Sequence, residues 1–155
     1  MLKLLRADAV LPRGERRLLG DFDKPCLERY VGVWKPESGL RYADMLVIEE
    51  GKPVGWPPRV ETFSFKSRNL ALLEEKALTA QMIEDAREAL RKYGETLDIR
   101  RDSLRPLLRE GSEVPVRRVR LIYEGGELKP TKIDDLDAVV NAVEEAVPGV
   151  EVLFQ

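Results

Sequence analysis

Two neighbouring segments decide the fold: RYADMLVIE at residues 41–49 and VETFSFK at residues 60–66. The first contains a continuous apolar run at 45–48, which is typical of a strand covered on both faces. The second is rich in β-branched and aromatic residues, which predicts another strand. The segment 51–58 contains three prolines and predicts a turn. We therefore expect two consecutive strands joined by this turn.

Helices and strands alternate along the rest of the chain. Residues 1–24 are expected to be irregular or weakly helical. The longest helix is expected over 70–93, with Asn69 as its N-cap and Gly94 just beyond its end. The other expected elements are a short helix over 25–31, a loop from Trp34 to Gly39, a strand over 96–100, a short helix over 103–109, a strand over 113–124 and an amphipathic helix over 133–147. This order predicts an α/β fold whose sheet is covered by helices.

The chain ends in EVLFQ at residues 151–155, which resembles the remnant of a viral-protease site used to remove tags. This interpretation predicts a single domain over residues 1–150 and leaves 151–155 outside it. The alternative is a genuine short strand from Gly149 to Phe154.

Composition limits the chemistry that the chain can perform. It has one cysteine, Cys26, and no histidine. This excludes an intramolecular disulfide, a four-cysteine zinc site and every triad that uses histidine as its base. Catalysis must then depend on carboxylates, lysine, tyrosine or a metal held by oxygen ligands, which suits Mg²⁺ or Mn²⁺. The net charge of −2 gives no general support to nucleic-acid binding, which depends on Lys and Arg contacts to phosphate.

No apolar run approaches the ~20 residues that span a bilayer. The N-terminus is charged too early for a signal peptide. We therefore expect no membrane partner and a cytoplasmic location.

Three features could carry chemistry. Asp44 lies near the start of an apolar strand, where an unpaired carboxylate costs several kcal/mol unless a cation compensates it. Lys66 ends the next strand, and alternation puts it on the face opposite Phe63 and Phe65. On the long helix, Glu74, Gln81 and Asp85 fall within an arc of roughly 40° at the rim of the apolar stripe. The alternatives are an exposed strand-end aspartate, a solvated lysine and an ordinary polar boundary.

The order and spacing of these residues resemble the PD-(D/E)XK nuclease superfamily over roughly residues 40–95, with looser agreement to residue 124. An Asp on one strand, a Glu and a Lys on the next, and a helix with Gln-x-x-x-Asp carry the resemblance. The nuclease domains of bacterial polymorphic (Rhs-type) toxins are the most similar group. The resemblance implies a restriction-endonuclease-like mixed central sheet of four to five strands flanked by helices.

It also implies a metal-dependent nuclease that cleaves nucleic acid, with DNA as the expected substrate. A toxin domain of this kind is delivered into the target cell as part of a larger secreted protein and is neutralised by a cognate immunity protein. The catalytic residues would be Asp44, Glu61, Lys66, Gln81 and Asp85, with Mg²⁺ or Mn²⁺ on Asp44 and Glu61 and the carbonyl of Phe65 assisting. Ser64 and Arg68 would contact nucleic acid. Further candidates for phosphate contact are Arg59, Arg100, Arg101, Arg117, Arg118 and Arg120.

One departure from the family pattern concerns the second acid. The position two before Lys66 should be acidic and is Ser64. Glu61 can replace that acid only if a bulge turns it to the other face. Otherwise the acid comes from the helix, as Glu74 or Asp85. A further glutamate expected before the first strand is Glu15 or Glu28.

Two other functions remain open at this point. The first is a non-catalytic interaction protein, such as an immunity protein, with Trp34 and Trp56 as interface anchors or as loop residues that cap the core. The second is a catalytically dead nuclease fold that binds nucleic acid without cutting it.

Overall fold

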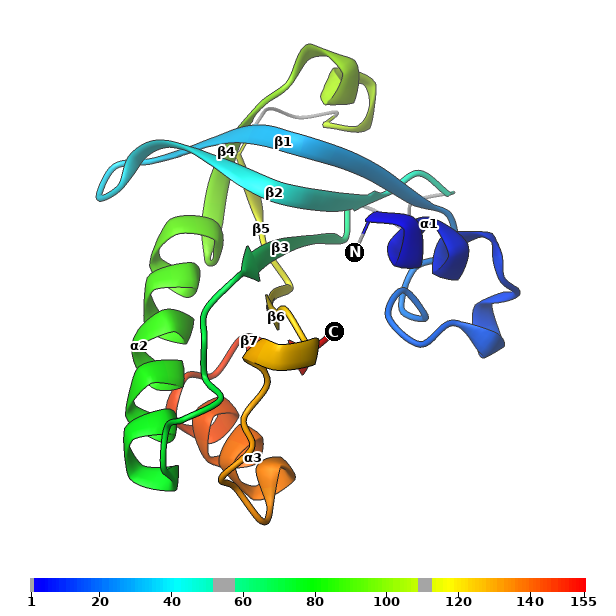
Figure 1. Cartoon of the computed structure of the whole chain (residues 1–155). Helices are drawn as coiled ribbons and strands as arrows, with labels where there is room; N and C mark the ends of the chain where they lie inside the picture. Colours follow the sequence, from blue (N-terminus) through cyan, green and yellow to red (C-terminus); the bar gives the residue numbers. More distant parts are fainter. Residues whose placement is uncertain (1, 52–57, 109–112) are drawn as a thin grey trace.

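The fold is α/β, with a seven-stranded mixed sheet flanked by helices (Figure 1). The computed structural model describes residues 2–51, 58–108 and 113–155. The strand order is β5-β4-β1-β2-β3-β6-β7. The strands are β1 Pro25–Lys35, β2 Gly39–Glu49, β3 Val60–Lys66, β4 Thr96–Arg100, β5 Glu113–Pro115, β6 Arg118–Tyr123 and β7 Val150–Phe154. The sheet therefore has more strands than the four to five predicted.

Pairing in the sheet changes from antiparallel to parallel at β3. Strands β1, β2 and β3 form an antiparallel meander, and β4 and β5 continue it antiparallel on the far side of β1. On the other side, β6 is parallel to β3 and β7 is parallel to β6. A parallel neighbour requires a long crossover, and the chain from β3 to β6 contains the long helix α2.

Helices cover both faces of the sheet. Helices α2 (Glu75–Tyr93) and α3 (Leu136–Ala146) pack on one face, and their apolar stripes meet alternate residues of β6 and β7. Helix α1 (Leu2–Val10) lies on the opposite face, where Leu5 joins a cluster with Met45 and Phe63. Three short 3-10 turns complete the fold: η1 Arg13–Glu15, η2 Asp102–Leu107 and η3 Gly126–Leu128.

The short helix expected over 25–31 is wrong, because these residues belong to β1. This strand pairs with β2 along its length and with β4 near its end, so hydrogen bonding on both edges overrides a weak local preference. Trp34 and Lys35 also belong to β1, which shortens the loop expected from Trp34 to Gly39. Tyr30 has φ 48°, a conformation uncommon outside glycine, within this strand.

The other elements differ from the prediction mainly at their ends. Strands β2, β3 and β4 were predicted correctly. Helix α2 begins at Glu75 with Glu74 as N-cap, because Asn69 instead accepts a hydrogen bond from the amide of Ala71 in a local turn. Gly94 is the C-cap of α2, as expected.

The remaining predicted ranges shorten or divide. The helix expected over 103–109 is the turn η2, the strand expected over 113–124 divides into β5 and β6, and the helix expected over 133–147 is α3. Most of the proline-containing turn at 51–58, with Trp56, lies outside the described residues.

Residues 150–154 are strand β7, which agrees with the strand alternative for the C-terminus. Val150 and Val152 are buried against α2 and α3. The amide of Val152 donates to Glu144 of α3 at 2.9 Å, and Glu151 forms an ion pair with Arg118. Whatever the origin of EVLFQ, these residues are part of the packed domain, and the boundary expected at residue 150 does not hold in the fold.

Deleting residues 150–155 should lower the free energy of unfolding by about 3–6 kcal/mol, because two valines lose burial worth roughly 1.5–3 kcal/mol each. The midpoint of urea unfolding measures this loss, with deletion of the exposed Gln155 alone as the control. An unchanged midpoint in the longer deletion would contradict the integration of β7.

In the described part of the chain, no helix combines the length and apolar character needed to cross a membrane.

Candidate functional site

The candidate site lies where β2 separates from β3. The last paired residues of the two strands at this end are Met45 and Phe63. Beyond them, Oδ2 of Asp44 accepts a hydrogen bond from the amide of Phe65 at 2.8 Å. The carboxylate thus replaces a strand–strand hydrogen bond and lies one residue away from Lys66. The sheet opens at this point, and a charged side chain occupies the opening.

A small hollow lies on the α2 side of this opening. Ser64 and Lys66 of β3 line it together with Glu88, Lys92 and Tyr93 of α2. Its volume is about 40 Å³, enough space for a water molecule by volume. Thr62 donates from Oγ1 to the carbonyl of Tyr93 at 2.9 Å, which fixes the end of α2 over β3. Side chains from two rigid elements therefore converge on one small space.

Glu88 supplies a carboxylate on this side of the sheet. Its Oε1 accepts from Nζ of Lys92, one helical turn further on, at 2.5 Å. This hydrogen bond holds the pKa of Glu88 below its ordinary value, and the nearby charge of Lys66 acts in the same direction. Glu88 is therefore an ionised carboxylate at neutral pH and lies within the electrostatic reach of Lys66.

The hydroxyl of Tyr93 is affected by the charges of both Asp44 and Glu88. Burial raises the pKa of the Tyr93 hydroxyl first, and the negative charges of Asp44 and Glu88 raise it further. Both carboxylates thus lie close enough to act on one phenol. Glu88 lines the hollow together with Lys66, whereas Asp44 accepts from the amide of Phe65, the residue before Lys66.

A second polar cluster fixes Arg68, two residues after Lys66. Asp85 of α2 is 1% exposed, and its two oxygens accept from Nε and Nη2 of Arg68 at 2.9 and 3.0 Å. Gln81 donates to the same carboxylate at 3.1 Å. The hydroxyl of Tyr123 also donates to it, at 2.7 Å. Burial, followed by the hydrogen bond to Asp85, raises the pKa of Tyr123, which therefore remains a donor.

Asp85 and Gln81 consequently orient Arg68 rather than projecting towards Lys66. All four hydrogen bonds of the Asp85 carboxylate are made within the protein. The side chain of Arg68 remains 40% exposed, so part of its guanidinium can meet a phosphate.

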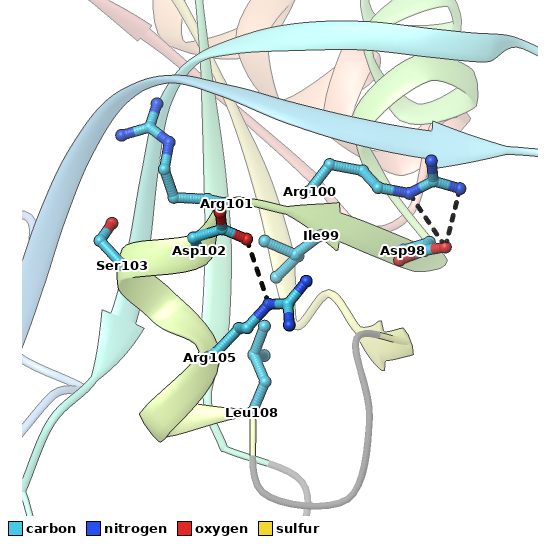
Figure 2. Close-up of a pocket in the computed structure, with 8 residues that line it drawn as sticks. All are labelled: Asp98, Ile99, Arg100, Arg101, Asp102, Ser103, Arg105 and Leu108. Atoms are coloured by element: carbon cyan, nitrogen blue, oxygen red, sulfur yellow. Dashed lines mark hydrogen bonds and ion pairs between the residues drawn. The ribbon is translucent and has the colours of Figure 1, made fainter.

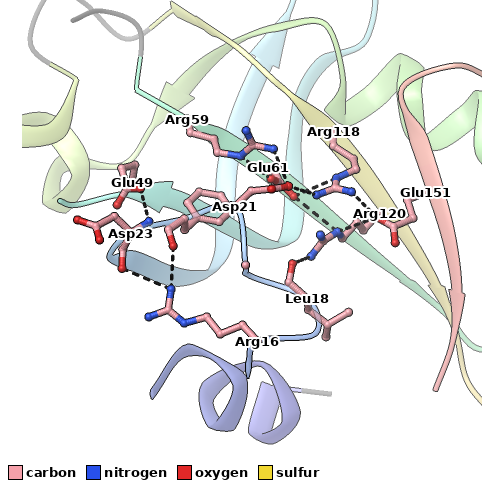
Figure 3. A network of polar contacts seen from close by, with 12 residues as sticks. Arg16, Leu18, Asp21, Asp23, Glu49, Arg59, Glu61, Arg118, Arg120 and Glu151 are labelled. Atoms are coloured by element: carbon pink, nitrogen blue, oxygen red, sulfur yellow. Dashed lines mark hydrogen bonds and ion pairs between the residues drawn. The ribbon is translucent and has the colours of Figure 1, made fainter. Parts of the chain in front are cut away.

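Glu61, predicted as a catalytic and metal-binding residue, lies on the opposite face of the sheet. Strand β3 keeps its alternation, so Glu61 points to the α1 side with Phe63. It is fully buried and pairs with Arg59 at 2.9 Å and with Arg118 at 3.3 Å, while Arg120 lies at 3.5 Å (Figure 3). The bulge required to turn Glu61 towards Asp44 is absent, because the β2–β3 and β3–β6 registers are continuous around this residue.

The ion-pair network around Glu61 connects three parts of the chain. Asp21 pairs with Arg59 and Arg118, and Glu151 of β7 pairs with Arg118 and Arg120. Arg120 also donates to the carbonyl of Leu18. Three acids thus offset three arginines that were candidates for phosphate contact, and the network attaches the segment after α1 and strand β7 to the sheet.

The other acids considered from the sequence lie away from the opening. Glu28 pairs with Arg101 at 3.2 Å, Glu15 is exposed in η1, and Glu74 is exposed at the start of α2. The sequence prediction missed Glu88 and Lys92. Their signal was present, since positions 81, 85, 88 and 92 continue one helical stripe at spacings of four, three and four residues.

The donor set at the opening can hold a divalent metal only with outside ligands. Among residues 2–51, 58–108 and 113–155, no three acid, cysteine or histidine side chains are grouped closely enough to hold an ion. Magnesium commonly takes one or two carboxylates and completes its shell with water and substrate phosphate. Asp44, Glu88 and the carbonyl of Phe65 are oxygen donors of the type that such a site uses.

Fold and site together define an α/β protein with an acid–lysine cluster at a sheet opening and a fixed arginine beside it. No protein family, curated protein or solved structure matches this chain.

Proposed function

We propose that this protein is a metal-dependent nuclease with a restriction-endonuclease-like fold that hydrolyses phosphodiester bonds, with DNA as its substrate. The observation that supports the proposal is that the Asp44 carboxylate accepts from the amide of Phe65, next to Lys66, whose side chain lines the hollow beside α2. The chain order also supports it: Asp44 on β2, Lys66 at the end of β3 and then helix α2, within a mixed sheet.

In this proposal Glu88 supplies the second catalytic acid, which the family pattern expects at the position that Ser64 occupies. Ser64 and Lys66 line the same hollow as Glu88, so a helix carboxylate reaches the space in front of the serine. Asp44 and Glu88 would hold Mg²⁺ or Mn²⁺. When bound, the metal lowers the pKa of a coordinated water and offsets charge on the scissile phosphate.

The remaining residues position the reactants. The Lys66 ammonium orients the attacking water and stabilises the additional negative charge on the phosphoryl oxygens in the transition state. Arg68, held by Asp85, contacts a neighbouring phosphate. Lys92 keeps Glu88 ionised and fixes its position. No step requires a histidine, in agreement with the composition.

Degradation of supercoiled plasmid DNA with Mg²⁺, compared with EDTA, tests the proposal. We expect cleavage by the wild-type protein with Mg²⁺, none with EDTA, and none with Asp44→Asn. Binding of DNA without cleavage would favour a catalytically dead nuclease fold. Neither binding nor cleavage would favour a non-catalytic interaction protein.

The Glu88→Gln substitution should lower the cleavage rate by about 10²- to 10³-fold, comparable to the loss of one preorganised charge-stabilising group. The matched control is Glu84→Gln, on the exposed side of the same helix. If both variants cut DNA at the wild-type rate, Glu88 is not the second acid.

The proposal extends to an antibacterial toxin domain with a cognate immunity protein. Induced expression in a bacterial cytoplasm should then stop growth, whereas expression of the Asp44→Asn variant should not. Normal growth with an active wild-type enzyme would remove the toxin role and leave the nuclease.

A further inference from the structure

The hairpin of β1 and β2 carries an exposed apolar patch made of Trp34, Leu40 and Tyr42, which are 36%, 46% and 58% exposed. In the sheet register Trp34 is opposite Leu40, and Tyr42 is opposite Gly32. Cross-strand partners point to the same face, so the three side chains lie together. Gly32 contributes no side chain, and the side chain of Leu40 packs against it. We call these three residues the hairpin patch.

The hairpin patch faces away from the end of α2. The neighbours of Trp34 along β1 are Val33, packed in the core, and Lys35, whose Nζ donates to the carbonyl of Gly94 at 3.1 Å. Alternation therefore directs Trp34 to the other face. The patch therefore lies on the face of the sheet opposite the Lys66 hollow, although Tyr42 precedes Asp44 by only two residues along β2.

Arginines accompany the exposed rings. The guanidinium carbon of Arg100 lies 5.8 Å from the centre of the Trp34 ring, and that of Arg29 lies 4.9 Å from the Tyr30 ring. Tyr30 is 58% exposed, on the same hairpin. An exposed aromatic ring with an arginine beside it offers stacking to a base and a cation to its phosphate.

Arg100, which lies over the Trp34 ring, also lines a hollow of about 790 Å³, whose lining residues Figure 2 shows. It is also lined by Arg101 and Arg105, which pair with Glu28 and with Asp102 of the same hollow. Asp98 lies opposite Trp34 in the register, and its Oδ2 accepts from Arg100. Among the described residues Oδ1 of Asp98 is buried without a hydrogen-bond partner.

These groups match the chemistry of an unpaired nucleotide. Trp34 and Tyr42 offer faces for bases, and the exposed Arg100 beside Trp34 suits a phosphate, although it also pairs with Asp98. A duplex hides base faces within its stack, whereas a single strand exposes them. We propose that the hairpin patch, with Arg100, binds single-stranded nucleic acid.

This inference specifies the substrate class of the proposed nuclease and rests on that proposal. The two fail separately, because binding is measured with EDTA present and needs no cleavage. If the wild type binds single strands but never cuts DNA, the patch survives and the nuclease fails. If the wild type cuts DNA but the patch variants bind single strands with wild-type affinity, the nuclease proposal stands and the patch proposal fails.

Fluorescence anisotropy of a labelled single strand of about 20 nucleotides, compared with the matching duplex, tests the patch. We expect tighter binding of the single strand. The double variant Trp34→Ala/Tyr42→Ala should raise its Kd at least about 10-fold, because stacking contributes roughly 1–3 kcal/mol per base. Trp34→Phe keeps a ring and should retain most of the affinity.

The control is Leu72→Ala, an exposed apolar residue outside the patch. Thermal unfolding confirms that each variant is folded before its binding is compared. Wild-type affinity in the folded double variant would overturn the proposal, as would equal affinity for single strand and duplex. A change of oligomeric state in the double variant with unchanged oligonucleotide affinity would also overturn it and would mark the patch as an interface between copies.

Discussion

Lys66→Met is expected to lower the rate of phosphodiester cleavage by about 10²- to 10³-fold without a large change in stability. The methionine keeps most of the aliphatic chain that lines the hollow with Ser64 and removes only the charge. Lys66 is half-buried, and it makes no ion pair within the described part of the chain. Its charge is therefore available for the reaction.

Initial rates of plasmid nicking measure the effect of Lys66→Met. Urea unfolding of the same preparation shows whether the fold is retained. Lys76→Met, an exposed lysine on α2, is the matched control and should cut at the wild-type rate. Cleavage by Lys66→Met at the wild-type rate would remove lysine from the mechanism and with it the assigned site.

Glu61→Gln is expected to reduce the free energy of unfolding by about 3–5 kcal/mol, because it removes the fully buried anion that three arginines share and leaves the network with excess positive charge. Glutamine has nearly the same shape as glutamate and lacks its charge. Arg59, Arg118 and Arg120 all lie within 3.5 Å of the Glu61 carboxylate. Arg120 is only 3% exposed, so water cannot readily replace the lost anion.

Chemical unfolding of Glu61→Gln measures this loss. The surface variant Glu84→Gln should change stability by no more than about 0.5 kcal/mol. Cleavage per folded molecule should remain at the wild-type level, because Glu61 lies across the sheet from Lys66. A Glu61→Gln variant that stays stable but loses cleavage would place Glu61 in the active site. That result would contradict its assignment to a structural ion-pair network.

Local pattern predicted the centre of the fold well. The apolar run in β2 and the β-branched residues of β3 favour a strand through short-range preferences. The sequence alone was therefore sufficient to predict these two strands. Strand β1 was missed because its stability comes from β2 and β4, which lie on either side of it. Strand β7 was misjudged because EVLFQ resembles a cleavage site, although its alternating valines indicate a strand.

The candidate site was predictable only in part. Alternation correctly put Lys66 on the face opposite Phe63, and the same rule argued against Glu61 as its partner. The acid that lies near Lys66, Glu88, could not be selected without knowing which turn of α2 crosses the end of β3. Gln81 and Asp85 were identified from the helical stripe, but their contact with Arg68 depends on the loop that follows β3.

Calorimetric titration with Mn²⁺ is the most direct test of the central claim, which is that Asp44 and Glu88 form one metal site beside Lys66. We expect Mn²⁺ binding by the wild type and by Glu84→Gln, and loss of that binding in both Asp44→Asn and Glu88→Gln. Wild-type Mn²⁺ binding in both of those variants would contradict the claim.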